Sequence, residues 1–311
     1  MINGKPRIVI WMVSNDGRFI GNAVNILERQ FNGVDIVGVT ANVPINLEDN
    51  TGRIIPFVPL NELNLNGGYD IILVAGARQI GMSEVTKFAR SINLDADKLL
   101  GDWIVCIPGF TLQKYRQLQR SRLSIFAINC YGGVISNHLG LPFHTPIVNM
   151  FFDEKEYIHF LRSPRVYMEE QLVFQGTGYD TAQKLTYPIY TLGNVSIHMN
   201  HYPNFDEAVA KWNERKQRIN WYNLFVTMHT ADPNVLEQFD ELPHCKKICF
   251  VPFKSDLDSA FYINPEYAYR ALNRETPFWN VVNQSGQGFP VYYYDIFDML
   301  LYGKKTPLIE M

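Results

Sequence analysis

The chain has 311 residues, of which 47% are hydrophobic and 19% charged, and its formal net charge is −3. This length exceeds that of most single domains, so we expect two domains, or one large core with an appended one. The slightly acidic balance gives no basic footprint for nucleic acid. Apolar runs are too short for a signal peptide or a membrane span, and four cysteines in a chain of this length do not make a disulfide framework. We therefore expect a reduced, cytoplasmic protein.

The first part of the chain, residues 1–110, alternates between apolar runs and amphipathic segments. This pattern predicts an α/β domain with a Rossmann-like parallel sheet. The expected strands are 7–13, 34–39, 54–58, 69–75 and 103–107, and the expected helices are 19–30 and 82–92. Residues 111–122 carry four positive charges and no acid, and we expect them to form a connecting helix.

The second part, residues 123–311, predicts another α/β domain with more irregular loops. A buried strand is expected from Ser124 to Ile128. Further strands are expected at 146–152, 195–199, 224–228, 247–253 and 291–294, and helices at 154–161, 205–218 and 235–239.

The first strand and helix of the chain lack the residues that bind dinucleotides. If Gly17 is the third glycine of G-x-G-x-x-G, Met12 and Ser14 stand at the first two positions, and Thr40 stands at the acidic one. We therefore expect no NAD or NADP cofactor in residues 1–110. The module is then a scaffold that binds nothing, or one that holds a nucleotide or sugar nucleotide by other contacts.

The most informative stretch runs from Ser124 to His138. An apolar run ends in a polar Asn-Cys pair, two glycines follow, and the next segment has helical character. A helix N-terminus of this kind can hold an anion and can lower the pKa of a thiol. The candidate ligand-binding residues here are Asn129, Tyr131, Gly132, Gly133 and Asn137.

Cys130 is the candidate nucleophile of this stretch, with His138, His144 or His201 as its base. A small buried thiol beside a glycine turn is the alternative.

The predicted helix 205–218 carries one arginine on its apolar side. Arg215 shares a stripe with Trp212 and Ile219, so its guanidinium needs a carboxylate, a carbonyl group or a ligand phosphate as partner. His201, in the loop before this helix, is a candidate catalytic acid or base, or a hydrogen-bonded residue that fixes the loop. Tyr131, Tyr202 and Trp212 are candidate surfaces for sugar stacking.

The metal patterns are weak. Cys245 and Cys249, with His244, lack a second pair at ligand spacing. Asp256 and Asp258 have the spacing of the carboxylate pair that holds a metal and a sugar-nucleotide diphosphate in many glycosyltransferases, but a solvated or turn-forming pair is the favoured interpretation. We expect no metal and no other cofactor.

Several of these segments together resemble one family. They are Ile128-Asn-Cys-Tyr-Gly-Gly133, His144-Thr-Pro-Ile-Val-Asn-Met-Phe-Phe152, Tyr187-Pro188 and the His201-Tyr202 to Asn220 segment with Phe205, Ala208, Trp212, Arg215 and Arg218. Over about residues 120–303 the chain resembles a bacterial domain of unknown function commonly labelled "exopolysaccharide biosynthesis protein". The resemblance implies a link to surface-polysaccharide assembly. We expect a transferase that acts on a phosphorylated or nucleotide-linked sugar, or a non-catalytic protein that binds glycans or nucleotide sugars as a scaffold. Neither needs nucleic acid or a membrane span.

Overall fold

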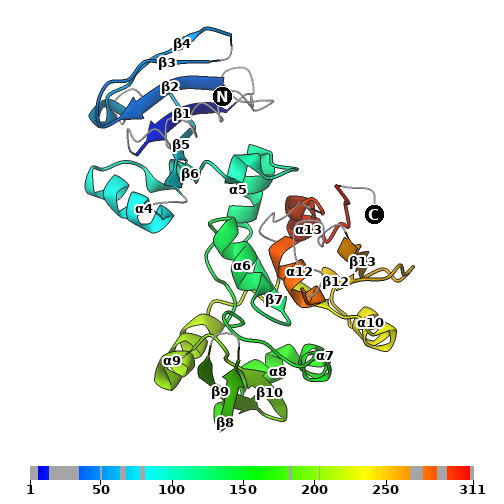
Figure 1. Ribbon diagram of the computed structural model, residues 1–311. Helices are drawn as coiled ribbons and strands as arrows, with labels where there is room; N and C mark the ends of the chain where they lie inside the picture. The colour runs from blue at the N-terminus through cyan, green and yellow to red at the C-terminus, as the bar shows by residue number, and fades with distance from the viewer. Residues whose placement is uncertain are drawn as a thin grey trace. The chain divides into compact units, whose positions relative to one another are not determined.

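The computed structural model describes residues 6–13, 35–49, 51–63, 68–77, 81–181, 184–202, 204–266, 276–285 and 293–308. The chain separates into two compact units, Met1–Leu112 and Gln113–Met311. Each unit contains a parallel sheet and helices, which confirms the α/β prediction (Figure 1). The predicted helix 19–30 and the turn with Ser14 and Gly17 lie outside the described residues. In the part of the chain that the structure describes, no helix is long and apolar enough to cross a membrane.

The first unit is built on a four-stranded parallel sheet in the order β2-β1-β5-β6. These strands are β1 (Arg7–Met12), β2 (Asp35–Ala41), β5 (Ile71–Ala75) and β6 (Leu99–Gly101). Every residue of β5 is buried, as are five of the six residues of β1. This explains their continuous apolar runs, because central strands of a parallel sheet are covered on both faces.

The rest of this unit differs from the prediction in detail. Residues 103–107 do not form a strand, and a 3-10 turn at Ile104–Cys106 follows β6 instead. β6 has only three residues, too few to give a periodic signal. The predicted strand 54–58 shortens to β4 (Ile54–Ile55), which pairs antiparallel with β3 (Leu47–Glu48). The predicted helix 82–92 is confirmed as α4 (Met82–Ser91). Two further 3-10 turns are Leu60–Glu62 and Ala96–Lys98.

The second unit contains a parallel sheet in the order β13-β12-β11-β7. Its strands are β7 (Ser124–Ala127), β11 (Leu224–His229), β12 (Lys247–Val251) and β13 (Ala260–Tyr262). β7 lies beside β11, with Ser124 level with Leu224 and Ala127 level with Thr227. Because the two strands are parallel, the residues that follow them meet at one edge of the sheet.

An irregular segment, residues 144–152, lies along the other side of β7. The Ser124 hydroxyl donates to the carbonyl of His144 at 2.6 Å, and the Phe152 N–H donates to the carbonyl of Ile128 at 2.9 Å. The predicted strand 146–152 is wrong, because Asn149 has a left-handed backbone (φ 63°) that interrupts extended structure. The segment therefore covers an otherwise open strand edge without forming a ladder.

A three-stranded antiparallel sheet completes the strands of this unit, in the order β10-β9-β8. Only β10 (Val195–His198) is predicted by the sequence, and the structure confirms it. β8 (Leu172–Asp180) and β9 (Leu185–Leu192) are missed. β8 holds two glycines and is mostly exposed, and β9 contains Pro188, so neither shows a buried-strand pattern.

Helices lie beside these sheets (Figure 1). The predicted helices near 154–161, 205–218 and 235–239 are confirmed as α7 (Glu154–Arg162), α9 (Phe205–Lys216) and α10 (Pro233–Asp240). The others are α5 (Leu112–Arg120), α6 (Tyr131–His138), α8 (Pro164–Glu169), α12 (Phe278–Ser285) and α13 (Ile296–Tyr302). The predicted strand 291–294 lies partly outside the described residues, and Tyr294 forms a single bridge with Pro307.

The predicted connecting helix is α5, which packs within the second unit. The Tyr115 hydroxyl donates to the carbonyl of Leu139 at 2.9 Å. The Lys114 ammonium contacts the carboxylates of Asp295 at 3.1 Å and Asp298 at 2.7 Å. These partly buried ion pairs tie α5 to the start of α13.

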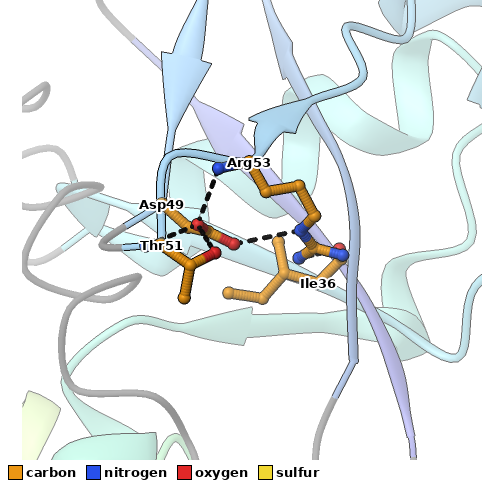
Figure 2. A network of polar contacts seen from close by, with 4 residues as sticks. All are labelled: Ile36, Asp49, Thr51 and Arg53. Atoms are coloured by element: carbon orange, nitrogen blue, oxygen red, sulfur yellow. Dashed lines mark hydrogen bonds and ion pairs between the residues drawn. The ribbon is translucent and has the colours of Figure 1, made fainter.

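The turn between β3 and β4 is closed by the carboxylate of Asp49 (Figure 2). One oxygen accepts from the Thr51 hydroxyl at 2.6 Å and from the Thr51 and Arg53 N–H groups, while the other accepts from Arg53 Nε at 3.0 Å. Arg53 also donates to the carbonyl of Ile36 at 3.2 Å, which joins the turn to β2. The hydrogen bond from the Thr51 hydroxyl is the largest effect that lowers the pKa of Asp49, from 3.8 to about 2.

We predict that Thr51→Val raises the pKa of Asp49 more than Arg53→Gln does. The hydroxyl bond is the stronger contribution, and the ion pair with Arg53 is exposed. Because the folded pKa is depressed, the turn gains stability above pH 3.8 and loses it as the pH falls through about 2. Titration of the Asp49 carboxyl carbon by NMR measures both variants. A larger shift in Arg53→Gln would show that the charge dominates.

Candidate functional site

Two polar side chains meet where β7 and β11 end. Asn129 follows β7, and His229 is the last residue of β11. The Asn129 Nδ2 lies 3.2 Å from His229 Nε2, and the Asn129 Oδ1 accepts the N–H of Tyr131 at 3.0 Å. The asparagine therefore joins the carboxyl ends of two parallel strands to the first turn of α6.

These hydrogen bonds fix the tautomer of His229. Because Oδ1 of Asn129 accepts from a backbone N–H, Nδ2 must be the atom that faces the imidazole, and Nδ2 can only donate. Nε2 of His229 is then an acceptor, and the ring proton sits on Nδ1. Burial lowers the pKa of His229 to about 4, so the ring is neutral at neutral pH.

A carboxylic acid lies beside the same edge. Glu154 is the first residue of α7, and the hydroxyl of Thr230, the residue after His229, donates to its carboxylate. Burial raises the pKa of Glu154 above its ordinary value, the Thr230 bond lowers it, and the nearby charge of Asp232 raises it further. Titratable groups with shifted pKa values at the carboxyl edge of a parallel sheet are typical of functional sites.

The pKa of the Cys130 thiol is shifted in the direction opposite to the one expected. Cys130 precedes α6, but burial raises the pKa of its thiol to about 11 instead of the helix lowering it. Its Sγ faces the carbonyl of Met150 at 3.9 Å. The thiol is thus protonated at neutral pH, and the prediction of a helix-activated thiolate is wrong.

The two glycines lie inside α6, which begins at Tyr131 and not near Gly133. A Cβ on Gly132 would stand 3.0 Å from Ile125 Cγ2, and one on Gly133 would stand 3.0 Å from Val148 Cγ1. Their missing side chains let α6 pack closely on β7 and on the 144–152 segment. This packing accounts for both glycines, and it brings the first turn of α6 to the edge of the sheet.

The other predicted ligand-binding residues differ in their exposure to solvent. Tyr131 and Trp212 are 2% and 1% exposed, and the Tyr131 hydroxyl is hydrogen-bonded to that of Tyr294. Rings so placed offer no face to a sugar, which argues against their predicted stacking role. Asn137 is exposed in the last turn of α6.

Arg215 has a protein partner other than a carboxylate. Its Nη1 donates to the Tyr202 hydroxyl at 2.7 Å, and that hydroxyl donates to the carbonyl of Val148 at 3.2 Å. The guanidinium also lies 5.6 Å from the centre of the Phe143 ring. Arg215, Tyr202 and Cys130 thus all contact the 144–152 segment or its neighbour Phe143. No carboxylate of the described residues forms an ion pair with Arg215.

His201 is exposed in the turn after β10, and its Nε2 lies 3.3 Å from Nδ2 of the adjacent Asn200. Partial burial of the ring lowers the pKa of His201, while the charge of Asp180 raises it.

The weak metal patterns gain no support. Asp256 and Asp258 precede β13, away from the carboxyl edge, and Cys249 is fully buried in β12. Within the described ranges, no three histidine, cysteine or acidic side chains are placed to hold a metal ion together.

Sequence reasoning missed His229 and Glu154. One signal for His229 was present, since it directly follows the predicted strand 224–228, as Asn129 follows the strand from Ser124. Polar residues after two neighbouring parallel strands meet at one edge. Only the strand order, however, shows that these two strands are neighbours.

Comparison with known proteins places the second unit in a family. A family model described as "Domain of unknown function (DUF1919)" matches residues 105–302. The chain belongs to the DUF1919 family. A Haemophilus influenzae relative, named "Uncharacterized protein", is 29% identical over 193 residues, which cover 60% of this chain and 86% of the relative. The expected membership in a family of unknown function is thus confirmed, over a somewhat longer range than 120–303.

We predict that His229 and His244 of the DUF1919 domain adopt opposite tautomers. His244 Nε2 lies 2.9 Å from the carbonyl of Leu161, so that nitrogen carries the proton, whereas in His229 it is Nδ1. Long-range proton–nitrogen NMR spectra distinguish the two. In Asn129→Asp the new carboxylate accepts a hydrogen bond from Nε2–H, so His229 should change tautomer and its pKa should rise from about 4.

The lowered pKa of His229 predicts that the stability of the domain depends on pH. The pKa of His229 is 6.5 when unfolded and about 4 when folded, so the unfolded state binds more protons between these values. The free energy of unfolding should therefore fall as the pH drops from 6.5 toward 4. The fall should be smaller in His229→Gln. An equal fall in the two proteins would contradict the neutral buried ring.

Arg215→Met tests the partner of the guanidinium. The variant loses one hydrogen bond from a charged group to Tyr202, which keeps its bond to Val148, so we expect a loss of about 2 kcal/mol in urea unfolding. Arg218→Met, which breaks an exposed pair with Glu214, is the control and should lose about 1 kcal/mol or less. A loss of about 3 kcal/mol or more in Arg215→Met would instead indicate a buried carboxylate partner.

Proposed function

We propose that the DUF1919 domain binds a phosphorylated or nucleotide-linked sugar at the carboxyl edge of β7 and β11. We further propose that it acts there as a transferase in cytoplasmic steps of exopolysaccharide or other surface-glycan biosynthesis. The observation that carries the proposal is the Asn129–His229 hydrogen bond at the end of two adjacent parallel strands. Ligands of open α/β sheets lie outside such strand ends.

The side chains at this edge suit a phosphate ester or a sugar. Neutral His229 offers its Nδ1–H as a donor, and no described residue accepts it. Glu154 is connected to this edge by its hydrogen bond with Thr230, the residue after His229. Its carboxylate can accept a proton from a sugar hydroxyl. We assign His229 to ligand orientation and Glu154 to proton transfer, in place of the predicted Cys130 and His201.

Arg215 supports the ligand class from the flank of the site. Its partner Tyr202 donates to the carbonyl of Val148, in the same 144–152 segment as Met150, which Cys130 contacts, and Arg215 itself is partly exposed. A guanidinium held by a phenol and an aromatic ring keeps several N–H donors for phosphate oxygens.

For the first unit we propose a Rossmann-like scaffold role. β1 lies between β2 and β5 in a parallel sheet, which is the strand arrangement of mononucleotide-binding halves. Thr40, at the position of the ribose-binding acid, is fully buried and carries no charge, so we expect no affinity for NAD or NADP.

A non-catalytic role is the second candidate function. It is favoured by the protonated thiol of Cys130, which removes the predicted nucleophile. In this role the domain binds a nucleotide sugar or a glycan as a scaffold and releases it unchanged.

The test is a binding screen of the full chain. Thermal melts with uridine diphosphate glucose, guanosine diphosphate mannose and inorganic pyrophosphate should show stabilisation by at least one of them. His229→Ala removes a hydrogen bond to a charged group and should weaken that binding about tenfold or more. Asn213→Ala, at an exposed position of α9, is the control and should bind as the wild type does.

The outcomes separate the candidates. Release of the nucleoside diphosphate when an acceptor sugar is added supports the transferase, and its loss in Glu154→Gln supports the assigned role. Binding without release supports the scaffold. Stabilisation by none of the probes, or equal stabilisation of His229→Ala, contradicts the site.

A further inference from the structure

Exposed arginines gather at the opposite end of the same sheet. α5 ends at Arg120 and β7 begins at Ser124, so Arg120 and Arg122 lie at the amino end of β7. Arg218 lies just past α9, in the chain that leads to β11. All three arginines are exposed. This end is the one that the proposed sugar site does not use.

Hydrogen bonds hold the two loops side by side. The carbonyl of Ser121 accepts from Asn223 Nδ2 at 2.9 Å and from Asn220 Nδ2 at 3.4 Å. The Ser124 hydroxyl accepts the Asn220 N–H at 2.8 Å. The arginines of both loops therefore share one surface. Burial is the main effect that lowers the pKa of the neighbouring His144, and the charges of Arg122 and Arg218 lower it further, which agrees with this arrangement.

The charges of this surface are not balanced locally. Arg218 pairs with Glu214, but no carboxylate of the described residues forms an ion pair with Arg120 or Arg122. Asp256 and Asp258 precede β13, which is the other outer strand of the sheet. The strand order thus separates these two aspartates from the arginines.

Arg122 holds an unfavourable backbone conformation. Its φ is +47°, in the left-handed region, just after the end of α5. Glycine is the residue that helix ends favour there, because a Cβ is strained in this region. A long cationic side chain at such a position sacrifices backbone stability, and strain of this kind often marks a functional residue.

An aromatic side chain projects from the same surface. Tyr222 is 97% exposed, in the loop whose asparagines bind Ser121. The preceding Trp221 lies under Arg165, whose guanidinium is 5.1 Å from the ring. A fully exposed tyrosine beside arginines combines an amphipathic ring with unpaired positive charge.

We propose that this surface, formed by Arg120, Arg122, Arg218 and Tyr222, docks the domain on a membrane rich in anionic phospholipids. Charge complementarity favours this occupant, since Arg120 and Arg122, which form no ion pair with a described carboxylate, are attracted to anionic headgroups. The ring of Tyr222 suits the headgroup region, where tyrosine is enriched. The inference is independent of the sugar site, which lies at the other end of the strands.

Co-sedimentation of the full chain with lipid vesicles tests this surface. Vesicles of phosphatidylcholine with phosphatidylglycerol should bind the protein, phosphatidylcholine alone should not, and added salt should weaken the binding. The Arg120→Gln, Arg122→Gly double variant should weaken it about fivefold for each arginine removed. Tyr222→Ala should weaken it as well.

The controls keep loss of binding distinct from loss of fold. Arg122→Gly relieves the left-handed backbone, so its melting temperature should not fall. Lys87→Gln with Arg90→Gln, which removes the same charge from α4 of the first unit, should leave vesicle binding unchanged. Equal binding of all variants, or equal binding to both vesicle types, would overturn the proposal. So would Arg122-dependent binding of inorganic phosphate or polyphosphate without vesicle binding.

Discussion

The amide of Asn129 is the contact on which the candidate site depends. It accepts the N–H of Tyr131 and donates to His229, so one side chain joins the end of β7, the start of α6 and the end of β11. The arrangement requires α6 to lie close to β7. Gly132 and Gly133 allow that approach, since a Cβ on either would stand 3.0 Å from the side chain of Ile125 or Val148. A packing requirement thereby sets the geometry of a polar site.

Desolvation decides the protonation states at this edge. A helix N-terminus attracts negative charge, but the effect is worth about 0.3–1 kcal/mol at most exposed sites. Burial has the opposite effect on a thiolate, and at Cys130 it is the larger one, which leaves the thiol protonated. Burial also keeps the His229 ring neutral and raises the pKa of Glu154. Neutral donors and a carboxyl group therefore face the edge, and a reactive thiolate does not.

The two ends of the parallel sheet differ in their chemistry. The carboxyl end brings together Asn129, His229 and Glu154, which are partly buried and hydrogen-bonded. The amino end presents Arg120 and Arg122, which are exposed. Because parallel strands place all their preceding loops on one side and all their following loops on the other, the two groups stay apart without any further device. The formal net charge of −3 gives no indication of this separation.

The sequence by itself determined the parts whose signal is local. Buried apolar runs marked β5 and β11, and an apolar stripe marked α9, whose first turn is capped by Asn204, which accepts the N–H of Glu207. The glycine-rich start of α6 was located, although its glycines serve packing. Tertiary structure alone decided which strands are neighbours, and hence that His229 meets Asn129 across 100 residues of sequence. It also decided the pKa of Cys130, the partner of Arg215 and the course of the antiparallel strands β8 and β9. These depend on burial and on contacts between distant segments, which a local pattern of residues does not contain.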